Sequence, residues 1–199
     1  MALLEKELND NLALDRGFMT FAYHRDSLIT LVLSETVTEE QYHEQPALQT
    51  LITGFPGQPP GDEILQKLLS KEEHFPEHLH PLLPLLKTYH KQIRAYGAGN
   101  GNRIDHVVGH IEYFMNNHPW WSKNIPDAPT SWSGNDSTAL AEMTDFFLHD
   151  PIYRNRVVVY AGLILNNGAY RRTELRALAL GLLAQINTCR TGFQPAEIK

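Results

Sequence analysis

Apolar residues recur three and four positions apart through most of this 199-residue chain, and this spacing constrains the fold more than any other feature. Residues with this spacing lie on one face of an α-helix, so the pattern predicts amphipathic helices. The clearest example runs from Glu77 to Tyr96, with apolar side chains at Leu79, Leu82, Leu83, Leu86, Tyr89 and Ile93. A chain of this length can bury one sizeable core. We predict an all-α, single-domain helical bundle of about seven or eight helices over residues 1–199.

Residues that favour caps and turns divide this pattern into helices. Gly17 is expected to end a first helix, and the stretch LITLVLS at 28–34 fits either a buried strand or a helix end. Thr38 and Gln41 have the spacing of a capping box, in which each satisfies a backbone N–H of the other. Asp62 is expected to cap a further helix.

The C-terminal third is expected to contain two more helices. The segment from Ile152 to Asn166 is apolar nearly all round, which favours a central position in the bundle. The pair Asn167-Gly168 is expected to end it, and Thr173 to cap the last helix.

A glycine-rich stretch, GAGNGN at 97–102, interrupts the helical pattern. A dinucleotide-binding loop requires a preceding strand, and residues 89–96 read as helix. The stretch is therefore interpreted as a turn between two helices, with Asn102 capping the second.

The longest irregular segment, residues 118–136, is rich in proline and contains Trp120, Trp121 and Trp132. Loops of this length in compact domains often carry function. Tryptophan is enriched at binding hot spots, so these three side chains are candidate contacts for a protein partner. The alternative is that they pack back on the core. We predict an ordered loop that forms the wall of a pocket or an interface.

The helix after the glycines carries a polar stripe. Arg103, His106, His110 and Tyr113 lie along one flank of it, beside an apolar face that begins at Ile104. His106 and His110 are four residues apart, the spacing with which two imidazoles of one helix reach one metal ion. The plainer alternative is a solvated flank of an amphipathic helix.

A second stripe supplies complementary ligands. Glu142, Asp145 and His149 share a face of the helix expected at 137–149. Helical proteins bind iron, manganese or zinc through such carboxylate and histidine rows on facing helices. Together with His106 and His110, this stripe predicts a mixed nitrogen and oxygen site for a divalent transition metal.

Arg103 and His110 also support a different chemistry. Six residues separate them on one helix, and this segment is similar to the arginine and histidine pattern of HEPN-type ribonucleases. The family usually has a polar residue after the arginine, and here Ile104 takes that place. The resemblance implies a metal-independent ribonuclease with His110 as acid or base and Arg103 stabilising phosphate charge. Tyr113, on the same stripe, is a further candidate catalytic residue.

Charge and targeting signals indicate which ligands and which cellular location to expect. The chain has a net charge of −6, yet its last third is basic, and Arg171 with Arg172 is a candidate site for an anionic ligand. Its single cysteine, Cys189, forms no internal disulfide. It shows no signal peptide and no apolar run that spans a bilayer, so we expect a cytoplasmic protein without membrane contact.

Three functions remain open at this point. The first is a metal-dependent enzyme, such as a non-haem iron protein, acting on a small molecule in the histidine- and carboxylate-lined pocket. The second is a partner-binding module without catalysis, such as an immunity or effector protein. The third is the HEPN-like ribonuclease.

Overall fold

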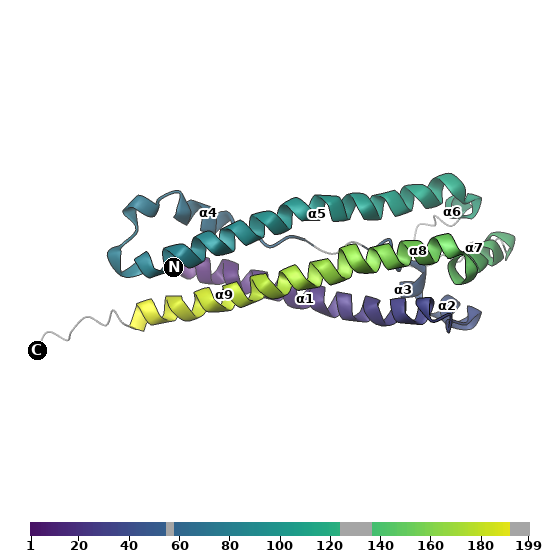
Figure 1. Ribbon diagram of the computed structural model, residues 1–199, viewed down its shortest axis with the longest axis horizontal. Helices are drawn as coiled ribbons and strands as arrows, with labels where there is room; N and C mark the ends of the chain where they lie inside the picture. Colours follow the sequence, from purple (N-terminus) through teal and green to yellow (C-terminus); the bar gives the residue numbers. More distant parts are fainter. Residues whose placement is uncertain (55–57, 124–136, 192–199) are drawn as a thin grey trace, which may run out of the picture. The chain divides into compact units, whose positions relative to one another are not determined.

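The computed structural model describes residues 1–54, 58–123 and 137–191, and all regular secondary structure in these ranges is helical. The all-α fold class is therefore confirmed. Three long helices dominate the ribbon in Figure 1: α1 (Ala2–Leu33), α5 (Leu83–Asn117) and α9 (Asn167–Thr191). The shorter helices are α2 (Glu39–Glu44), α3 (Pro46–Gln49), α4 (Glu63–Leu69), α6 (Pro119–Lys123), α7 (Ser137–His149) and α8 (Pro151–Tyr160). Two 3₁₀ segments, η1 (Glu72–His74) and η2 (Glu77–Leu82), precede α5, and a π-helical segment, η3 (Ala161–Asn166), joins α8 to α9.

The chain divides into two compact units. Unit 1 comprises Met1–Met19, Gly57–Asn100 and Ala169–Lys199, and unit 2 comprises Thr20–Pro56 and Gly101–Gly168. Helices α1, α5 and α9 each contribute residues to both units. A single domain over residues 1–199 stays a prediction.

Unit 1 is built on an aliphatic core. Side chains from α1, α4, α5 and α9 fill it, which agrees with the apolar spacing read from residues 77–96. Tyr89 and Tyr96 are the large aromatic members. The completely or almost completely buried aliphatic members include Leu4, Leu8, Leu65, Leu82, Leu86, Leu182 and Ile186.

Unit 2 is built on aromatic rings. Phe114 of α5 packs against the rings of Trp121, Phe146 and Phe147, with centroid distances of 5.2, 5.8 and 5.8 Å. Tyr153 of α8 adds an edge-to-face contact with Phe147 at 4.7 Å. Such offset and edge-to-face pairs stabilise more than their buried area alone.

Helix α5 runs straight through the glycine-rich stretch, so the predicted turn at 97–102 is wrong. Its buried residues keep an alternating spacing of four and three across the glycines. This heptad spacing holds one face of a long helix against its neighbours. The spacing starts at Leu82, the last residue of η2, and continues within α5 through the buried residues Leu86, Tyr89, Ile93, Tyr96, Asn100, Arg103, Val107, His110 and Phe114.

Other predicted breaks are also absent from the described helices. Gly17 lies within α1, and residues 28–33 are helical, so the strand alternative at 28–34 is wrong. Asn167-Gly168 does not end a helix, because η3 leads directly into α9. Thr173 is no cap: its hydroxyl donates to the carbonyl of Ala169 inside α9. In each case the helix is continued by packing, which outweighs weak local preferences.

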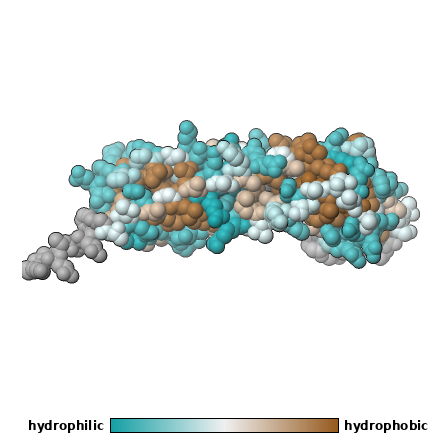
Figure 2. Space-filling model, turned by 60° about the horizontal axis from the view of Figure 1, so that its bottom comes forward, coloured by the Kyte–Doolittle hydropathy of each residue, from teal (hydrophilic) through white to brown (hydrophobic). Residues whose placement is uncertain are grey.

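The segment from Ile152 to Asn166 is not wholly buried, so its predicted central position is wrong. Tyr153, Val157 and Tyr160 face the core of unit 2, whereas Val158, Val159 and Leu163 are about half exposed. Apolar side chains at the surface appear as brown areas among the hydrophilic ones in Figure 2.

Two helix starts illustrate local and non-local capping. The capping box at Thr38 is confirmed, with both hydrogen bonds between Thr38 and Gln41 present. Asp62 stands at the N-cap position of α4, but its side chain makes no capping bond. The Glu7 carboxylate of α1 accepts from the N–H groups of Ile64 and Leu65 instead, at 2.8 and 3.1 Å.

Candidate functional site

Two residues of the polar stripe predicted on α5 are turned into the protein, and His106 and Tyr113 are half-buried. Arg103 and His110 are only 6% and 2% exposed, and they share the buried face with Val107 and Phe114. Ile104, expected on the apolar face, is partly exposed instead. The heptad spacing explains the difference, because it places residues 103, 107, 110 and 114 on one seam.

His110 belongs to a compact cluster with α8. Its Nδ1 accepts from the Arg156 guanidinium at 3.0 Å, and its ring lies 4.4 Å from that of His106. The Arg156 guanidinium also stacks over the ring of Tyr113, with its carbon 3.6 Å from the ring centroid. Arg156 was not among the site residues predicted from the sequence, although an arginine inside the apolar run of residues 152–165 is a signal for a buried polar contact.

The electrostatics of this cluster favour neutral histidines. Burial, followed by the proximity of His106 and Arg156, lowers the pKa of His110 to about 4. Burial and the Arg156 charge also lower the pKa of His106. A neutral His110 can accept a hydrogen bond from Arg156, whereas a protonated His110 would be repelled by the charge of the Arg156 guanidinium.

The stripe on α7 lies elsewhere in unit 2. Glu142, Asp145 and His149 line one pocket, as their shared helix face predicts, and His149 Nδ1 lies 3.5 Å from the Asp145 carboxylate. The remaining lining residues are His118, Pro119, Trp120, Phe146 and Asp150. The pocket contains about 720 Å³ of space, including its open mouth.

The predicted five-ligand metal set is not assembled. His106 and His110 are engaged around Arg156 and do not line the α7 pocket. Among the residues that the structure describes, no group of three or more His, Cys, Asp or Glu side chains is arranged to hold a metal ion. The stripes of α5 and α7 therefore do not form the shared metal site that was predicted from the sequence.

The α7 pocket, which we call the acidic pocket, combines carboxylates with aromatic rings. His118 stacks on Trp120 at 4.9 Å and contacts the Phe146 ring at 4.2 Å between centroids. Burial lowers the pKa of His118, and its Nε2 is buried without a hydrogen-bond partner in the described part of the chain. One carboxylate oxygen of Asp150 accepts from two N–H groups at the start of α8. His118 and Asp150 were not among the site residues predicted from the sequence.

Two of the three tryptophans predicted to contact a partner are core residues. Trp120 and Trp121 are 3% and 9% exposed and belong to the aromatic core of unit 2. Trp132 lies outside the described residues, as does most of the predicted loop over 118–136. The part described at its start is α6, not irregular structure.

The two arginines proposed for an anion do not act as a pair. Arg172 is 1% exposed and is held by the Tyr96 hydroxyl and the Gln58 carbonyl. Arg171 is half-buried and makes none of these contacts. Adjacent residues of a helix point in directions about 100° apart, so they do not share a face.

Comparison with known proteins adds no function. No protein family, functionally characterised protein or solved structure matches this chain. The fold class is all-α. Within the described helices, none is both long and apolar enough to cross a bilayer.

Proposed function

We propose that this chain is a partner-binding protein without catalysis, and that the acidic pocket receives a lysine or arginine side chain of a basic protein. The observation that carries the proposal is the combination of Glu142, Asp145 and Asp150 with the aromatic side chains of Trp120 and Phe146 around one open pocket. Carboxylates pair with the cationic head of such a side chain, and aromatic walls accept its apolar stem.

The distribution of charge supports a basic partner. Unit 2 contains five Lys or Arg against twelve Asp or Glu, a net charge of −7, whereas unit 1 contains twelve against eleven, a net charge of +1. The negative charge of the chain thus belongs to the unit that contains the acidic pocket. Such a field raises the rate of encounter with a positively charged partner.

The two enzymatic alternatives draw less support from the geometry. A general acid or base must come within hydrogen-bond distance of its substrate, and His110 is enclosed between His106 and Arg156. Arg103, the other residue of the HEPN-like pattern, is buried as well. The metal-dependent enzyme requires ligands that converge, which the described residues do not provide.

Titration with a fluorescently labelled peptide of alternating lysine and alanine tests the proposal. We expect saturable binding to the full chain in fluorescence anisotropy, and no binding of a glutamate and alanine peptide. The variant Glu142→Gln with Asp145→Asn removes two exposed carboxylates from the acidic pocket. It should weaken binding at least about tenfold, the loss expected when close charge pairs are removed.

The matched control removes the same charge outside the acidic pocket. Asp105 and Glu112 are exposed on α5 in the same unit and do not line it. Asp105→Asn with Glu112→Gln should change the affinity less than about threefold, through the general field alone. Equal losses in the two double variants, or no saturable binding by the wild-type chain, would contradict the proposal.

A further inference from the structure

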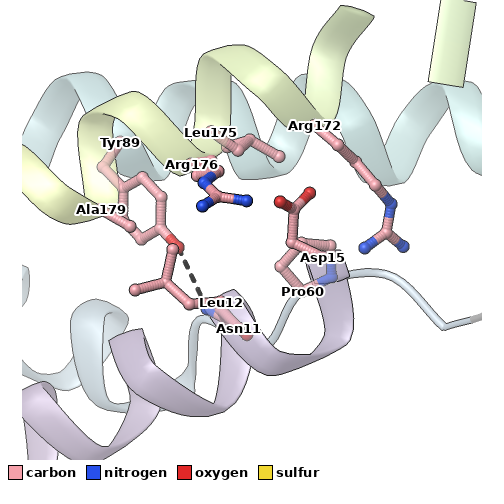
Figure 3. Close-up of a pocket in the computed structure, with 9 residues that line it drawn as sticks. All are labelled: Asn11, Leu12, Asp15, Pro60, Tyr89, Arg172, Leu175, Arg176 and Ala179. Atoms are coloured by element: carbon pink, nitrogen blue, oxygen red, sulfur yellow. Dashed lines mark hydrogen bonds between the residues drawn. The ribbon is translucent and has the colours of Figure 1, made fainter. Parts of the chain in front are cut away.

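Unit 1 contains a second pocket, formed by α1, α5, α9 and Pro60 (Figure 3). Its empty space is about 230 Å³ when the open mouth is counted, but the enclosed part has room for about one water molecule, so a larger ligand enters only when an exposed lining side chain moves aside. Apolar walls come from Leu12, Leu175 and Ala179. We call it the Asp15 pocket, because the carboxylate of that residue points into it (Figure 3).

Asp15 lies on the buried seam of α1, where Asn11 and Arg25 are the other polar residues. It is 5% exposed, and neither of its carboxylate oxygens has a hydrogen-bond partner among the described residues. Burial raises the pKa of Asp15, and the charges of Arg172 and Arg176 oppose this rise. A buried carboxylate without hydrogen bonds is costly, so a ligand that brings a donor into the pocket is stabilised by pairing with Asp15.

Arg172, by contrast, has a buried N–H donor that lacks an acceptor among the described residues. Its Nε donates to the Tyr96 hydroxyl at 2.9 Å, and its Nη2 donates to the Gln58 carbonyl at 2.8 Å. Its guanidinium carbon lies 4.6 Å from the centroid of the Phe18 ring. These contacts hold the side chain in place, while Nη1 is buried without a hydrogen-bond partner in the described part of the chain.

Two further groups can contribute donors at the same pocket. The Tyr89 hydroxyl accepts from the Asn11 amide at 3.2 Å, so its own proton can be donated. Arg176 lines the pocket but is exposed, and Figure 3 shows its guanidinium on the side of the Asp15 carboxylate away from Arg172. An exposed arginine can swing outward to admit a ligand without disturbing the core.

We propose that the Asp15 pocket binds a compact carboxylate with a hydrogen-bond donor on the adjacent carbon, an α-amino or α-hydroxy acid. The donor of the ligand pairs with the Asp15 carboxylate, and the carboxylate of the ligand pairs with Arg172 and Arg176. The ligand thereby satisfies both buried groups at once, which a simple anion or a simple amine does not. The nearby apolar walls restrict the ligand to a small side chain. This site is independent of the acidic pocket of unit 2.

Isothermal titration calorimetry of the full chain at pH 7 tests the proposal with four ligands: glycine, glycolate, acetate and methylammonium. We expect glycine or glycolate to bind, and acetate and methylammonium to bind at least about tenfold more weakly, because each leaves one buried partner unpaired. Stronger binding of glycine identifies the amino acid class, and stronger binding of glycolate identifies the hydroxy acid class.

Substitutions of the lining residues test which side chains contact the ligand. Asp15→Asn should weaken binding of the preferred ligand at least about tenfold, and so should Arg176→Gln. Arg171→Gln removes the same charge from α9 outside the pocket and should leave the affinity within about twofold. Because Arg176 is exposed, its variant keeps the test valid even where Asp15→Asn does not fold.

Three results would overturn the proposal. The first is that none of the four ligands binds. The second is that acetate binds as tightly as glycolate and glycine, which describes a simple anion site. The third is that Arg176→Gln and Arg171→Gln have equal effects, which describes a general attraction to the basic surface of α9.

Discussion

His110 shows how a single buried side chain links stability to pH. The pKa of His110 is about 4 in the folded chain, against an ordinary value of 6.5 for an unfolded one. Between these values the unfolded chain binds a proton that the folded chain does not. Stability is therefore full above pH 6.5 and falls as the pH drops toward 4. The shift corresponds to on the order of 3 kcal/mol.

We predict that His110→Phe reduces this loss of stability, because phenylalanine fills a similar volume and carries no titrating group. The free energy of unfolding, measured by urea denaturation at pH 7.5 and at pH 5, should differ less in the variant than in the wild-type chain. Some pH dependence remains, since the pKa values of His106 and His118 are also lowered. His24→Phe, at an exposed position of α1, is the control and should keep the wild-type difference. The idea fails if the two variants behave alike.

At the scale of the element, α5 stays helical although it contains glycines, which lower the stability of a helix. Gly97 and Gly101 are exposed within the helix, and an added Cβ at either position meets no atom within 4 Å. Glycine inside a helix costs about 0.5–1 kcal/mol relative to alanine. We predict that Gly97→Ala with Gly101→Ala raises the free energy of unfolding by about 1–2 kcal/mol.

The same variant discriminates between a continuous helix and a turn. A turn that needs a positive φ at these glycines would be strained by alanine, and the variant would then unfold more easily. Urea denaturation followed by circular dichroism gives the sign. Gly17→Ala, which also meets no neighbouring atom inside α1, is a matched control and should stabilise by a similar amount per glycine.

At the scale of the whole molecule, the question is whether two units unfold as one. Helices α1, α5 and α9 contribute to both units without a break, so helix loss that starts in one unit can spread into the other. We predict one cooperative transition. Leu86→Ala, a cavity in the core of unit 1, should cost about 2–5 kcal/mol.

The tryptophans provide a reporter on the other unit. Trp120 and Trp121 belong to the aromatic core of unit 2, so their fluorescence follows that unit while the Leu86→Ala substitution acts on unit 1. The variant should lower the midpoint seen by fluorescence as much as the midpoint seen by circular dichroism. A fluorescence midpoint that stays at the wild-type value would contradict both the prediction and the single domain expected from the sequence.

The sequence by itself determined the helical class of the fold and the apolar face over residues 77–96. Periodic apolar residues, the capping box at Thr38 and the face shared by Glu142, Asp145 and His149 all arise from contacts within four residues. Such contacts depend on local geometry that is the same in every helix, so they can be read directly. The heptad spacing across the glycines was also present in the sequence, and applying it would have indicated that α5 continues and that Arg103 and His110 are buried.

The tertiary structure alone decided which polar groups meet. Arg156 reaches His110 from 46 residues away, and Arg172 reaches the Tyr96 hydroxyl from 76 residues away. These partners depend on which helices are neighbours, and many polar side chains with the right spacing could have been paired instead. The cost of burying an unpaired charge selects among them only when the packed core exists. For that reason the predicted metal ligands were separated, and the pocket around Asp15 became visible only in three dimensions.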